Sequence, residues 1–266
     1  MSEAIKIVKL SACYIVEEEN NIFFVMSLKS VLNSNIFDEI IIIDNSHDGT
    51  LELIDSFNDR RIKVIHNRFQ HESKGANGRQ RNEYLKWVTG DWVLVLDADE
   101  ILSDDAYKLR EYAESGKFNV YDIKMLHFIY SLKWVDATSA GNPLVKDENH
   151  VHRVLHRFFK MTPNVFYPEL EHPVLSGFEG EVGIIDDVEI YHMGYMKGIQ
   201  MVFDKYNLNM AKSNMHNAEF LKAWYKAHVN GTYPVKEINS SEINSYLLKE
   251  LMEGEVPDDI LPTARR

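Results

Sequence analysis

The stretch Trp92-Val93-Leu94-Val95-Leu96, followed at once by Asp97-Ala98-Asp99, decides how the rest of the chain is interpreted. Five apolar residues in a row predict a strand that is buried on both faces, as in the parallel sheet of an α/β protein. The two carboxylates stand where this strand would leave the sheet, and ligands of open α/β sheets bind outside the carboxyl ends of the strands. Hard oxygen ligands at that place suit a divalent cation that in turn binds phosphate.

The composition excludes several classes of protein. The 266 residues suffice for one large domain or two small ones, and a net charge of -12 argues against a nucleic-acid partner and against docking on anionic lipid by charge alone. The single cysteine, Cys13, excludes an intrachain disulfide and a zinc site built on cysteines. The start lacks the features of a signal peptide, and no stretch reaches the ~18 to 20 apolar residues that span a bilayer. We expect a cytoplasmic protein without a transmembrane segment, for which peripheral membrane contact stays open.

The first hundred residues alternate between segments typical of strands and of helices. The expected strands cover residues 5–15, 39–43, 61–66 and 91–96, and the expected helices cover residues 17–32, 48–57 and 77–88. Ser46 or Asp48 is the expected N-cap of the second helix. Such a rhythm predicts a mostly parallel sheet with right-handed crossovers.

This rhythm ends near residue 100. We expect a helix over residues 103–115 and strands over 120–130 and 154–160, in a mixed part of the sheet. Residues 131–150 are polar and without periodicity, which predicts a mobile or functional loop. From residue 198 to about residue 229 the pattern is helical again. The expected division is one α/β domain over 1–197, with halves 1–100 and 101–197, and a helical C-terminal extension over 198–266 packed on it.

Two further segments offer groups for a nucleotide. Asp44 follows the second strand, so its carboxylate would share the edge of the sheet with Asp97 and could accept hydrogen bonds from a base or a ribose. An equally good interpretation has Asp44 capping a turn. Lys74 and Arg81 belong to a basic, glycine-containing helix start, which suits a diphosphate but also suits a solvated surface.

Histidines and glutamates further along the chain could complete the site. A neutral imidazole, from His192 or from His172, could add to the metal coordination begun by Asp99. Glu169 and Glu171 could act as a general base, because burial of either would raise its pKa toward the useful range. For each of these residues an ordinary core or surface role is the commoner explanation.

Taken in order, these segments resemble the family 2 (GT-A fold) glycosyltransferases. Ile43-Asp44-Asn45-Ser46-His47-Asp48-Gly49-Thr50 is similar to the family's DxSxDGT segment, and Arg81-Asn82 is similar to its RN helix. Gly90 to Glu100 closely matches its GDWxLxLDADE segment. His156-Arg157-Phe158-Phe159, Glu171-His172 and His192-Met193-Gly194-Tyr195 resemble the branch that builds lipopolysaccharide core and related glycans. In that branch the pair reads His-Glu.

The resemblance implies a GT-A fold with a nucleotide-sugar-binding half over 1–100 and an acceptor half over 101–197. It implies inverting transfer of a sugar from a nucleotide-diphosphate sugar, with a UDP-sugar as the expected donor, to a hydroxyl of a saccharide or similar acceptor. Mg²⁺ or Mn²⁺ would be bound by Asp97, Asp99 and His192, and Glu171, or else Glu169, would be the base. The implied nucleotide-sugar contacts are Ser11, Tyr14, Glu17, Asp44, Lys74, Arg81, Asp97 and Ala98.

Two other functions remain open at this level. A non-catalytic module that binds nucleotide-sugars or glycans would explain the altered Glu171-His172 order. A sugar nucleotidyltransferase would favour a loop rich in glycine and arginine right after the first strand. Because the chain has an acidic segment there, the nucleotidyltransferase is the weaker alternative.

Overall fold

A computed structural model describes residues 7–66, 76–139, 142–146, 149, 151–170, 172–196, 203, 207 and 215–253. The chain divides into two compact units, described here separately. The first unit comprises Met1–Lys124 and Arg153–Ile190, and the second comprises Met125–His152 and Tyr191–Arg266. This division differs from the expected one, because the strands β6 (Val120–Ile129) and β11 (Val182–Tyr195) each continue from one unit into the other.

The first unit is built on a parallel sheet, as the alternating pattern predicts. Its strands are β1 (Leu10–Val16), β2 (Glu39–Asp44), β3 (Ile62–His66) and β4 (Trp92–Asp97). β1 pairs in parallel with β2 and β4, and β2 pairs in parallel with β3. On the other side of β4 lies β10 (Arg153–Lys160), antiparallel to β4 and to β6, while β5 (Glu100–Leu102) pairs with β11. The mixed part of the sheet is therefore confirmed as well.

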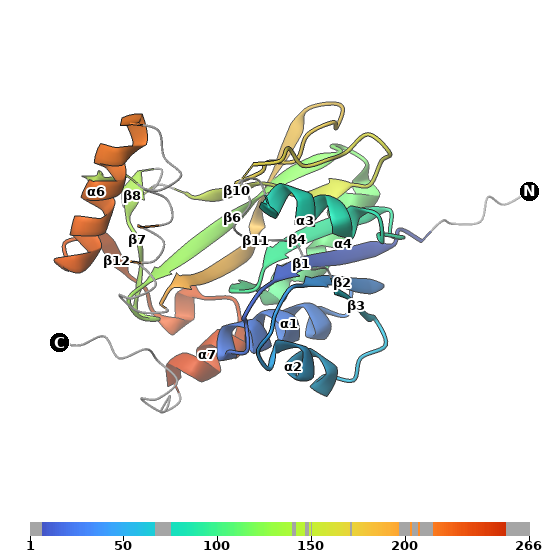
Figure 1. Cartoon of the computed structure of the whole chain (residues 1–266), viewed down its shortest axis with the longest axis horizontal. Helices are drawn as coiled ribbons and strands as arrows, with labels where there is room; N and C mark the ends of the chain where they lie inside the picture. Colours follow the sequence, from blue (N-terminus) through green and yellow to red (C-terminus); the bar gives the residue numbers. More distant parts are fainter. Residues whose placement is uncertain are drawn as a thin grey trace, which may run out of the picture. The chain divides into compact units, whose positions relative to one another are not determined.

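Helices cover both faces of this sheet. α1 (Ile22–Ser34) and α2 (Thr50–Ser56) lie below the strands in Figure 1, and α3 (Ala76–Leu85) lies above them. The predicted helix over 103–115 is a 3₁₀ turn, η1 (Asp104–Tyr107), followed by α4 (Lys108–Ser115). The predicted start of the first helix at residue 17 is wrong. Asn21 caps α1 by accepting from the backbone N–H groups of Phe23 and Phe24.

Alternation along the strands assigns their side chains to the two faces. Cys13, Val93 and Val95 pack against Tyr84 of α3, in one core cluster. Tyr14 faces the other way and contacts Phe24 of α1. Asp97 continues the alternation of Val93 and Val95, so it lies on the α3 face at the carboxyl end of β4. Burying each large apolar side chain of this core stabilises the unit by about 1.5–3 kcal/mol.

The second unit contains short strands that the sequence pattern did not predict. The segment expected to be an irregular loop holds β7 (Trp134–Asp136), β8 (Thr138–Ser139) and β9 (Asn142–Lys146). β7 pairs with β12 (Val235–Glu237), and Ile129, Trp224 and Tyr233 form a small core. The C-terminal elements are α6 (Met215–Val229), η2 (Ser240–Glu242) and α7 (Tyr246–Glu253). α6 agrees with the end of the expected helical pattern.

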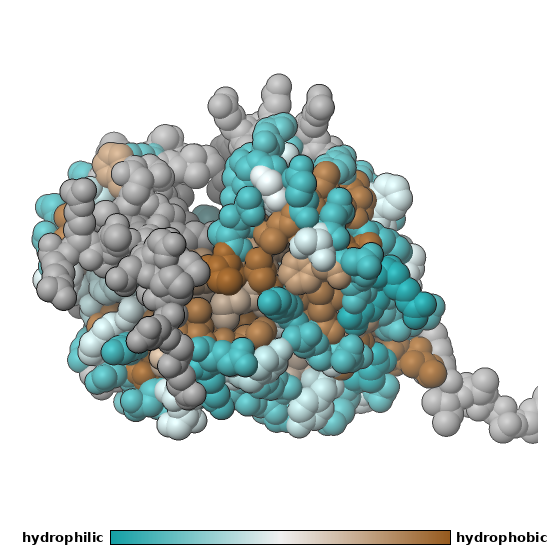
Figure 2. All heavy atoms as spheres, turned by 90° about the horizontal axis from the view of Figure 1, so that it is seen from below, coloured by the Kyte–Doolittle hydropathy of each residue, from teal (hydrophilic) through white to brown (hydrophobic). Residues whose placement is uncertain are grey.

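The face seen in Figure 2 mixes hydrophobic residues with hydrophilic ones. Among the helices in the described part of the chain, none combines the length and the apolar composition that a membrane crossing requires.

Candidate active site

Four charged side chains of the first unit meet at the carboxyl end of β4. Nη2 of Arg81, from α3, lies 2.6 Å from Oδ1 of Asp97. Arg157, from β10, donates to both oxygens of the same carboxylate, with Nη2 2.9 Å from Oδ2 and Nη1 3.4 Å from Oδ1. The Asp97 side chain is 38% exposed, whereas the side chains of Arg81 and Arg157 are 10% and 12% exposed. The carboxylate is therefore accessible to solvent, whereas the two arginine side chains are largely buried.

Glu100, the first residue of β5, also belongs to this cluster. Its Oε2 accepts from the backbone N–H of Asp97 at 2.8 Å, and its Oε1 lies 3.0 Å from Nη2 of Arg157. Burial raises the pKa of Glu100 well above its ordinary value, although the charge of Arg157 opposes the shift. Burial lowers the pKa of Arg157, but the charges of Asp97 and Glu100 outweigh it, so the net shift is upward and the guanidinium stays charged.

Arg81 is held in place by the packing of α3. Its guanidinium lies 5.6 Å from the centre of the Tyr167 ring, a cation–π contact. The next residue, Asn82, donates to the carbonyl of Tyr167 and accepts from its backbone N–H. The pair Arg81-Asn82 thus fastens the helix to residue 167 while one member reaches Asp97.

Asp44 ends β2 at the same edge of the sheet and on the opposite face. It is 1% exposed, and its Oδ1 accepts from the backbone N–H of Ser46, which closes a turn. Its Oδ2 lies 3.0 Å from Nδ1 of His66 but has no partner with hydrogen-bond geometry. Glu17 is half-buried beside this turn, next to Asn45, and burial raises its pKa.

The segment after residue 167 lies over the start of α3. Gly78 donates to the carbonyl of Leu170, and a Cβ placed on Gly78 would stand 2.0 Å from the carbonyl oxygen of Pro168. Glu169 is exposed, at 65%, and forms an ion pair with Arg79 at 3.1 Å. It is therefore not the buried carboxylate that the sequence argument supposed. Glu171 and Lys74 lie outside the described residues.

The fit of a divalent cation depends on Asp99. Ala98 is buried and Asp99 is half-buried on the turn between β4 and β5. Within the described ranges no cluster of three or more His, Cys, Asp or Glu residues is arranged to hold a metal ion. Asp99 suits a hard cation that takes its other ligands from a diphosphate and water. The oxygens of Asp97 already accept from two guanidinium groups, and its predicted role as a metal ligand stays a prediction.

His192 belongs to the second unit. Its Nδ1 lies 2.9 Å from Nδ1 of His127, and the His127 ring makes an edge contact with His152. Its predicted role as a metal ligand stays a prediction. His172 is exposed in the first unit.

Two predicted nucleotide contacts are turned away from this edge. Ser11 is fully buried near the start of β1, and its hydroxyl donates to Glu39 at 2.7 Å. Tyr14 is also fully buried, with its hydroxyl 3.1 Å from that of Ser27 beneath α1. Because β1 begins at Leu10 and not at residue 5, Ser11 lies at the opposite end of the strand from Asp97. Neither residue is kept among the candidate ligand contacts.

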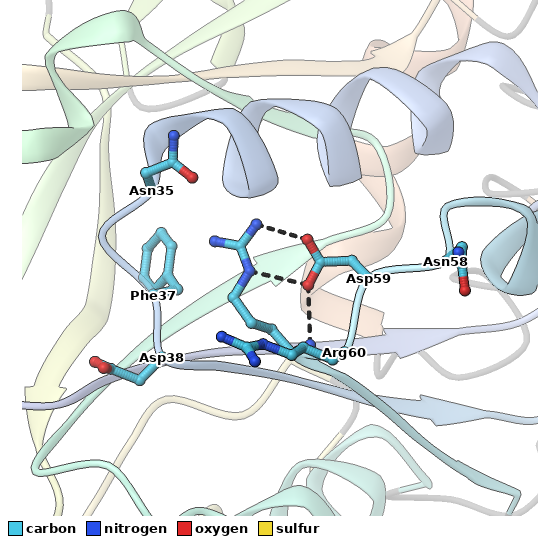
Figure 3. A pocket seen from close by; sticks show the side chains of 7 residues that line it. Asn35, Phe37, Asp38, Asn58, Asp59 and Arg60 are labelled. Carbon is cyan, nitrogen blue, oxygen red and sulfur yellow. Dashed lines mark hydrogen bonds and ion pairs between the residues drawn. The ribbon is translucent and has the colours of Figure 1, made fainter.

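A pocket of about 670 Å³ also lies at that opposite end of the sheet (Figure 3). Its lining is polar, and two of the lining residues form an ion pair in which Arg61 donates to both carboxylate oxygens of Asp59. The lining residues are Asn35, Phe37, Asp38, Asn58, Asp59, Arg60 and Arg61. The pocket therefore lies apart from the residues that the motifs indicate.

Comparison with known proteins agrees with the motif order. A sequence model of the family described as glycosyl transferase family 2 matches residues 24–170. No curated protein matches the sequence.

Among solved structures, TarS of S. aureus (1–349) in complex with UDP-GlcNAc is 14% identical, with a TM-score of 0.50, over 84% of this chain and 72% of that chain. A longer TarS structure gives a TM-score of 0.49 at 14% identity, and the match covers 83% of this chain but only 43% of that chain. A mannosyltransferase of Pyrobaculum calidifontis with GDP-Man and Mn²⁺ gives 0.49 at 13% identity over 85% and 71%. At this identity the TarS likeness supports the mixed α/β fold with its central sheet.

Sequence reasoning missed Arg157 and Glu100 as members of the site. Both lie inside quoted motifs, but only the docking of β10 beside β4 brings Arg157 to Asp97. Glu39 was also missed, because nothing in the sequence distinguishes a buried glutamate at the start of a strand from an exposed one.

Proposed function

Because the chain belongs to glycosyl transferase family 2, we propose that it transfers a sugar from a nucleotide-diphosphate sugar to a hydroxyl group of an acceptor. The observation that carries this proposal is the cluster at the carboxyl end of β4. There the accessible Asp97 carboxylate is paired with two charged arginines, and Asp99 follows on the adjoining turn, at the edge where α/β sheets bind ligands.

The nucleotide would bind along this edge. The unsatisfied Oδ2 of Asp44 suits a base N–H, for which the side chain would need to become accessible on binding. Asp97 would accept from the ribose. TarS, which shares the fold, was solved with UDP-GlcNAc, so a UDP-sugar is the first donor to test.

A divalent cation fits this proposal through Asp99. Bound Mg²⁺ or Mn²⁺ would neutralise the charge that develops on the leaving diphosphate. Asp99 would be positioned by the turn between β4 and β5. The buried Glu100 would fix this turn, because its carboxylate accepts from the backbone N–H of Asp97.

A glutamate near residue 170 would supply the base. The acceptor oxygen would form a bond to the anomeric carbon as the bond to the diphosphate breaks, and the acceptor proton would pass to the carboxylate. Attack from the face opposite the diphosphate inverts the anomeric centre. We assign the base to Glu171, with Glu169 second because its ion pair with Arg79 would have to open.

A thermal-shift screen tests this function. The full chain is heated with UDP-GlcNAc, GDP-mannose and other nucleotide sugars, each with and without Mn²⁺. A ligand at 100 times its Kd stabilises the native state by about 2.7 kcal/mol, which corresponds to a rise in Tm of about 5–10 °C. We expect a shift with one nucleotide sugar that requires Mn²⁺.

The same screen includes two variants. Asp99→Asn should lose the shift, and Asp55→Asn, an exposed control on α2, should keep it. Absence of a shift with every nucleotide sugar, or an unchanged shift in Asp99→Asn, would refute the proposed site. Proton NMR of the product then reads the anomeric configuration, and retention would contradict the single-displacement step.

A further inference from the structure

His156 lies at an irregularity of β10. The register of β10 against β6 shifts between Val154 and Phe158, and His156 has a left-handed φ of 56°. Asp122 of β6 stabilises this conformation, because its Oδ1 accepts from the backbone N–H of His156 at 2.7 Å. Bulges of this kind redirect a side chain next to an active site.

The bulge turns the His156 ring to the α3 face of the sheet. Phe159 belongs to the core cluster on that face, so regular alternation would place Arg157 on it and His156 on the opposite one. The His156 ring instead makes an edge contact with Phe178, at 5.0 Å between ring centres, and Phe178 packs against the same cluster. His156 and Arg157 therefore share the face on which Asp97 lies.

The carboxylate of Asp122 also orients the imidazole ring. Its Oδ1 lies 2.8 Å from Nδ1 of His156, and because a carboxylate only accepts, Nδ1 is the donor. In the neutral ring Nε2 is then a hydrogen-bond acceptor. Within the described part of the chain no hydrogen bond engages Nε2, and the side chain is 17% exposed. The backbone bond alone would hold the bulge, so the bond to Nδ1 adds a fixed ring orientation.

The place of this pair follows from the sheet. β4 and β6 are both antiparallel to β10, so they run in the same direction, and Asp122 lies toward the edge that Asp97 occupies. Neighbouring strands lie about 4.8 Å apart, so β6 is about 10 Å from β4 across β10. In the proposed function the nucleotide extends from Asp44 on β2 to Asp97 on β4. Continued in the same direction, this line reaches β10 and β6, where the acceptor would lie.

We propose that His156, oriented by Asp122, binds a hydroxyl group of the acceptor through Nε2. The ligand class is a saccharide or another polyhydroxyl compound, because a ring nitrogen that only accepts selects a hydroxyl donor, and Phe178 offers an apolar ring beside it. This inference rests on the proposed function for the presence of an acceptor. His156 is the binding residue, and Asp122 is the positioning residue.

His156→Asn removes the imidazole and keeps the bulge. Asparagine tolerates a left-handed φ, whereas alanine would add backbone strain to the loss of the ring. The full chain is incubated with Mn²⁺, the nucleotide sugar that gives the largest thermal shift, and the methyl glycosides of glucose, galactose and N-acetylglucosamine. Mass spectrometry detects the product. For the best glycoside, His156→Asn should raise the acceptor KM by about ten-fold, while the Kd of UDP with Mn²⁺ stays within about two-fold of wild type.

Arg153→Gln is the matched control on the same strand. Arg153 pairs with Asp186 on the exposed surface, at 3.0 and 3.1 Å, so this variant changes β10 without removing the imidazole. It should keep the wild-type acceptor KM. An unchanged acceptor KM in His156→Asn, or an equal weakening of UDP binding in that variant, would overturn the proposal.

Nitrogen NMR of the histidine rings tests the pair without a nucleotide. The ¹⁵N-histidine-labelled chain is studied at about pH 8, where an ordinary histidine is neutral, and His156→Asn identifies the signal. We expect the proton on Nδ1 in wild type. In Asp122→Asn the side-chain amide would donate to Nδ1, which moves the proton to Nε2.

The methyl glycosides are then titrated into the labelled wild-type chain, and the Nε2 signal of His156 should shift. A wild-type ring with its proton on Nε2, or an Nε2 signal that no glycoside shifts, would overturn the proposal. A wild-type chain that neither binds UDP nor glycosylates any glycoside would refute the proposed function, whereas the position of the ring proton still judges the pair by itself.

Discussion

The α3 face of the parallel sheet carries a carboxylate cluster at each end, and the two clusters differ. At the amino end, Glu39 accepts from the hydroxyl of Ser11, from Thr89, from the backbone of Gly90 and from Lys63. At the carboxyl end, Asp97 accepts from two arginines while 38% of its side chain stays exposed. The Glu39 side chain is only 6% exposed.

The difference separates a cluster that stabilises the fold from the cluster that we propose binds the ligand. These partners of Glu39 tie β1, β3 and the residues after α3 to β2. The partners of Asp97 are two largely buried arginines, and part of the Asp97 carboxylate remains accessible to solvent. A buried charge with complete hydrogen bonding favours rigidity, whereas an accessible one held by cations favours ligand binding. Each of the following changes affects one end of this face.

Glu39→Gln should have the largest effect on stability. Hydrogen bonds to a charged group contribute about 1.5–3 kcal/mol each, so we expect a loss of about 2–3 kcal/mol at neutral pH and a Tm lower by about 5–10 °C. Nucleotide binding measured well below the Tm should be unchanged. Chemical denaturation gives the free energy of unfolding of both proteins.

The pH dependence of that loss follows from the pKa of Glu39. Burial would raise this pKa, but the hydrogen bonds from Lys63, Thr89 and Ser11 outweigh it and lower the pKa to about 2 from an ordinary 4.5. The ionised group therefore stabilises the fold fully above about pH 4.5, and this contribution is lost as the pH falls toward 2. The gap in Tm between wild type and Glu39→Gln should narrow over that range. A constant gap would contradict the assignment.

Two glycine-to-alanine variants, one at each end of the α3 face, should have effects of intermediate size. In Gly78→Ala the new Cβ meets the backbone oxygen of Pro168 at 2.0 Å, so the segment that carries Glu169 must shift. In Gly90→Ala the Cβ meets the hydroxyl of Ser11 at 2.3 Å, a partner of Glu39. Overpacking of this kind costs about 1–3 kcal/mol.

The two glycine variants should differ in what they lose. Gly78→Ala should reduce turnover of the donor more than stability, and Gly90→Ala should reduce stability and leave donor binding intact below its Tm. Release of UDP and the denaturation midpoint, measured on both variants, give the comparison. Identical profiles would mean that the two ends of the face are not functionally distinct.

Lys63→Met should have the smallest effect. Lys63 lies 2.7 Å from Glu39 but its side chain is about half exposed, and exposed ion pairs contribute about 0–1 kcal/mol. We expect a loss within that range and no change in nucleotide binding, as measured by urea unfolding and titration. A loss comparable to that of Glu39→Gln would show that the lysine, and not the hydroxyl and backbone donors, maintains the charge of Glu39.

The sequence predicts the parallel sheet of the first unit well. Continuous apolar runs mark β2 and β4, and polar residues directly after them place Asp44 and Asp97 at one edge. The face on which each residue lies was harder to predict. The prediction for Tyr14 failed because the alternation along β1 places its side chain beneath α1. The prediction for Ser11 failed because the strand starts later than expected.

The part of the chain after residue 100 is less predictable from sequence, for physical reasons. The contact between Arg157 and Asp97 spans 60 residues and depends on the pairing of β10 with β4 and on one bulge. The short strands β7, β8 and β9 lack a clear alternation. Glu171 and Lys74 lie outside the described residues, so their roles stay predictions.

Isothermal titration of UDP with Mn²⁺ into wild type, Glu39→Gln and Asp99→Asn, at one temperature below all three Tm values, distinguishes binding at one end of the α3 face from stability at the other. We expect Glu39→Gln to bind with the wild-type Kd although it is the least stable of the three proteins. Asp99→Asn should keep the wild-type Tm but lose binding. Wild-type binding by Asp99→Asn, or an equal loss in Glu39→Gln, would contradict this distinction.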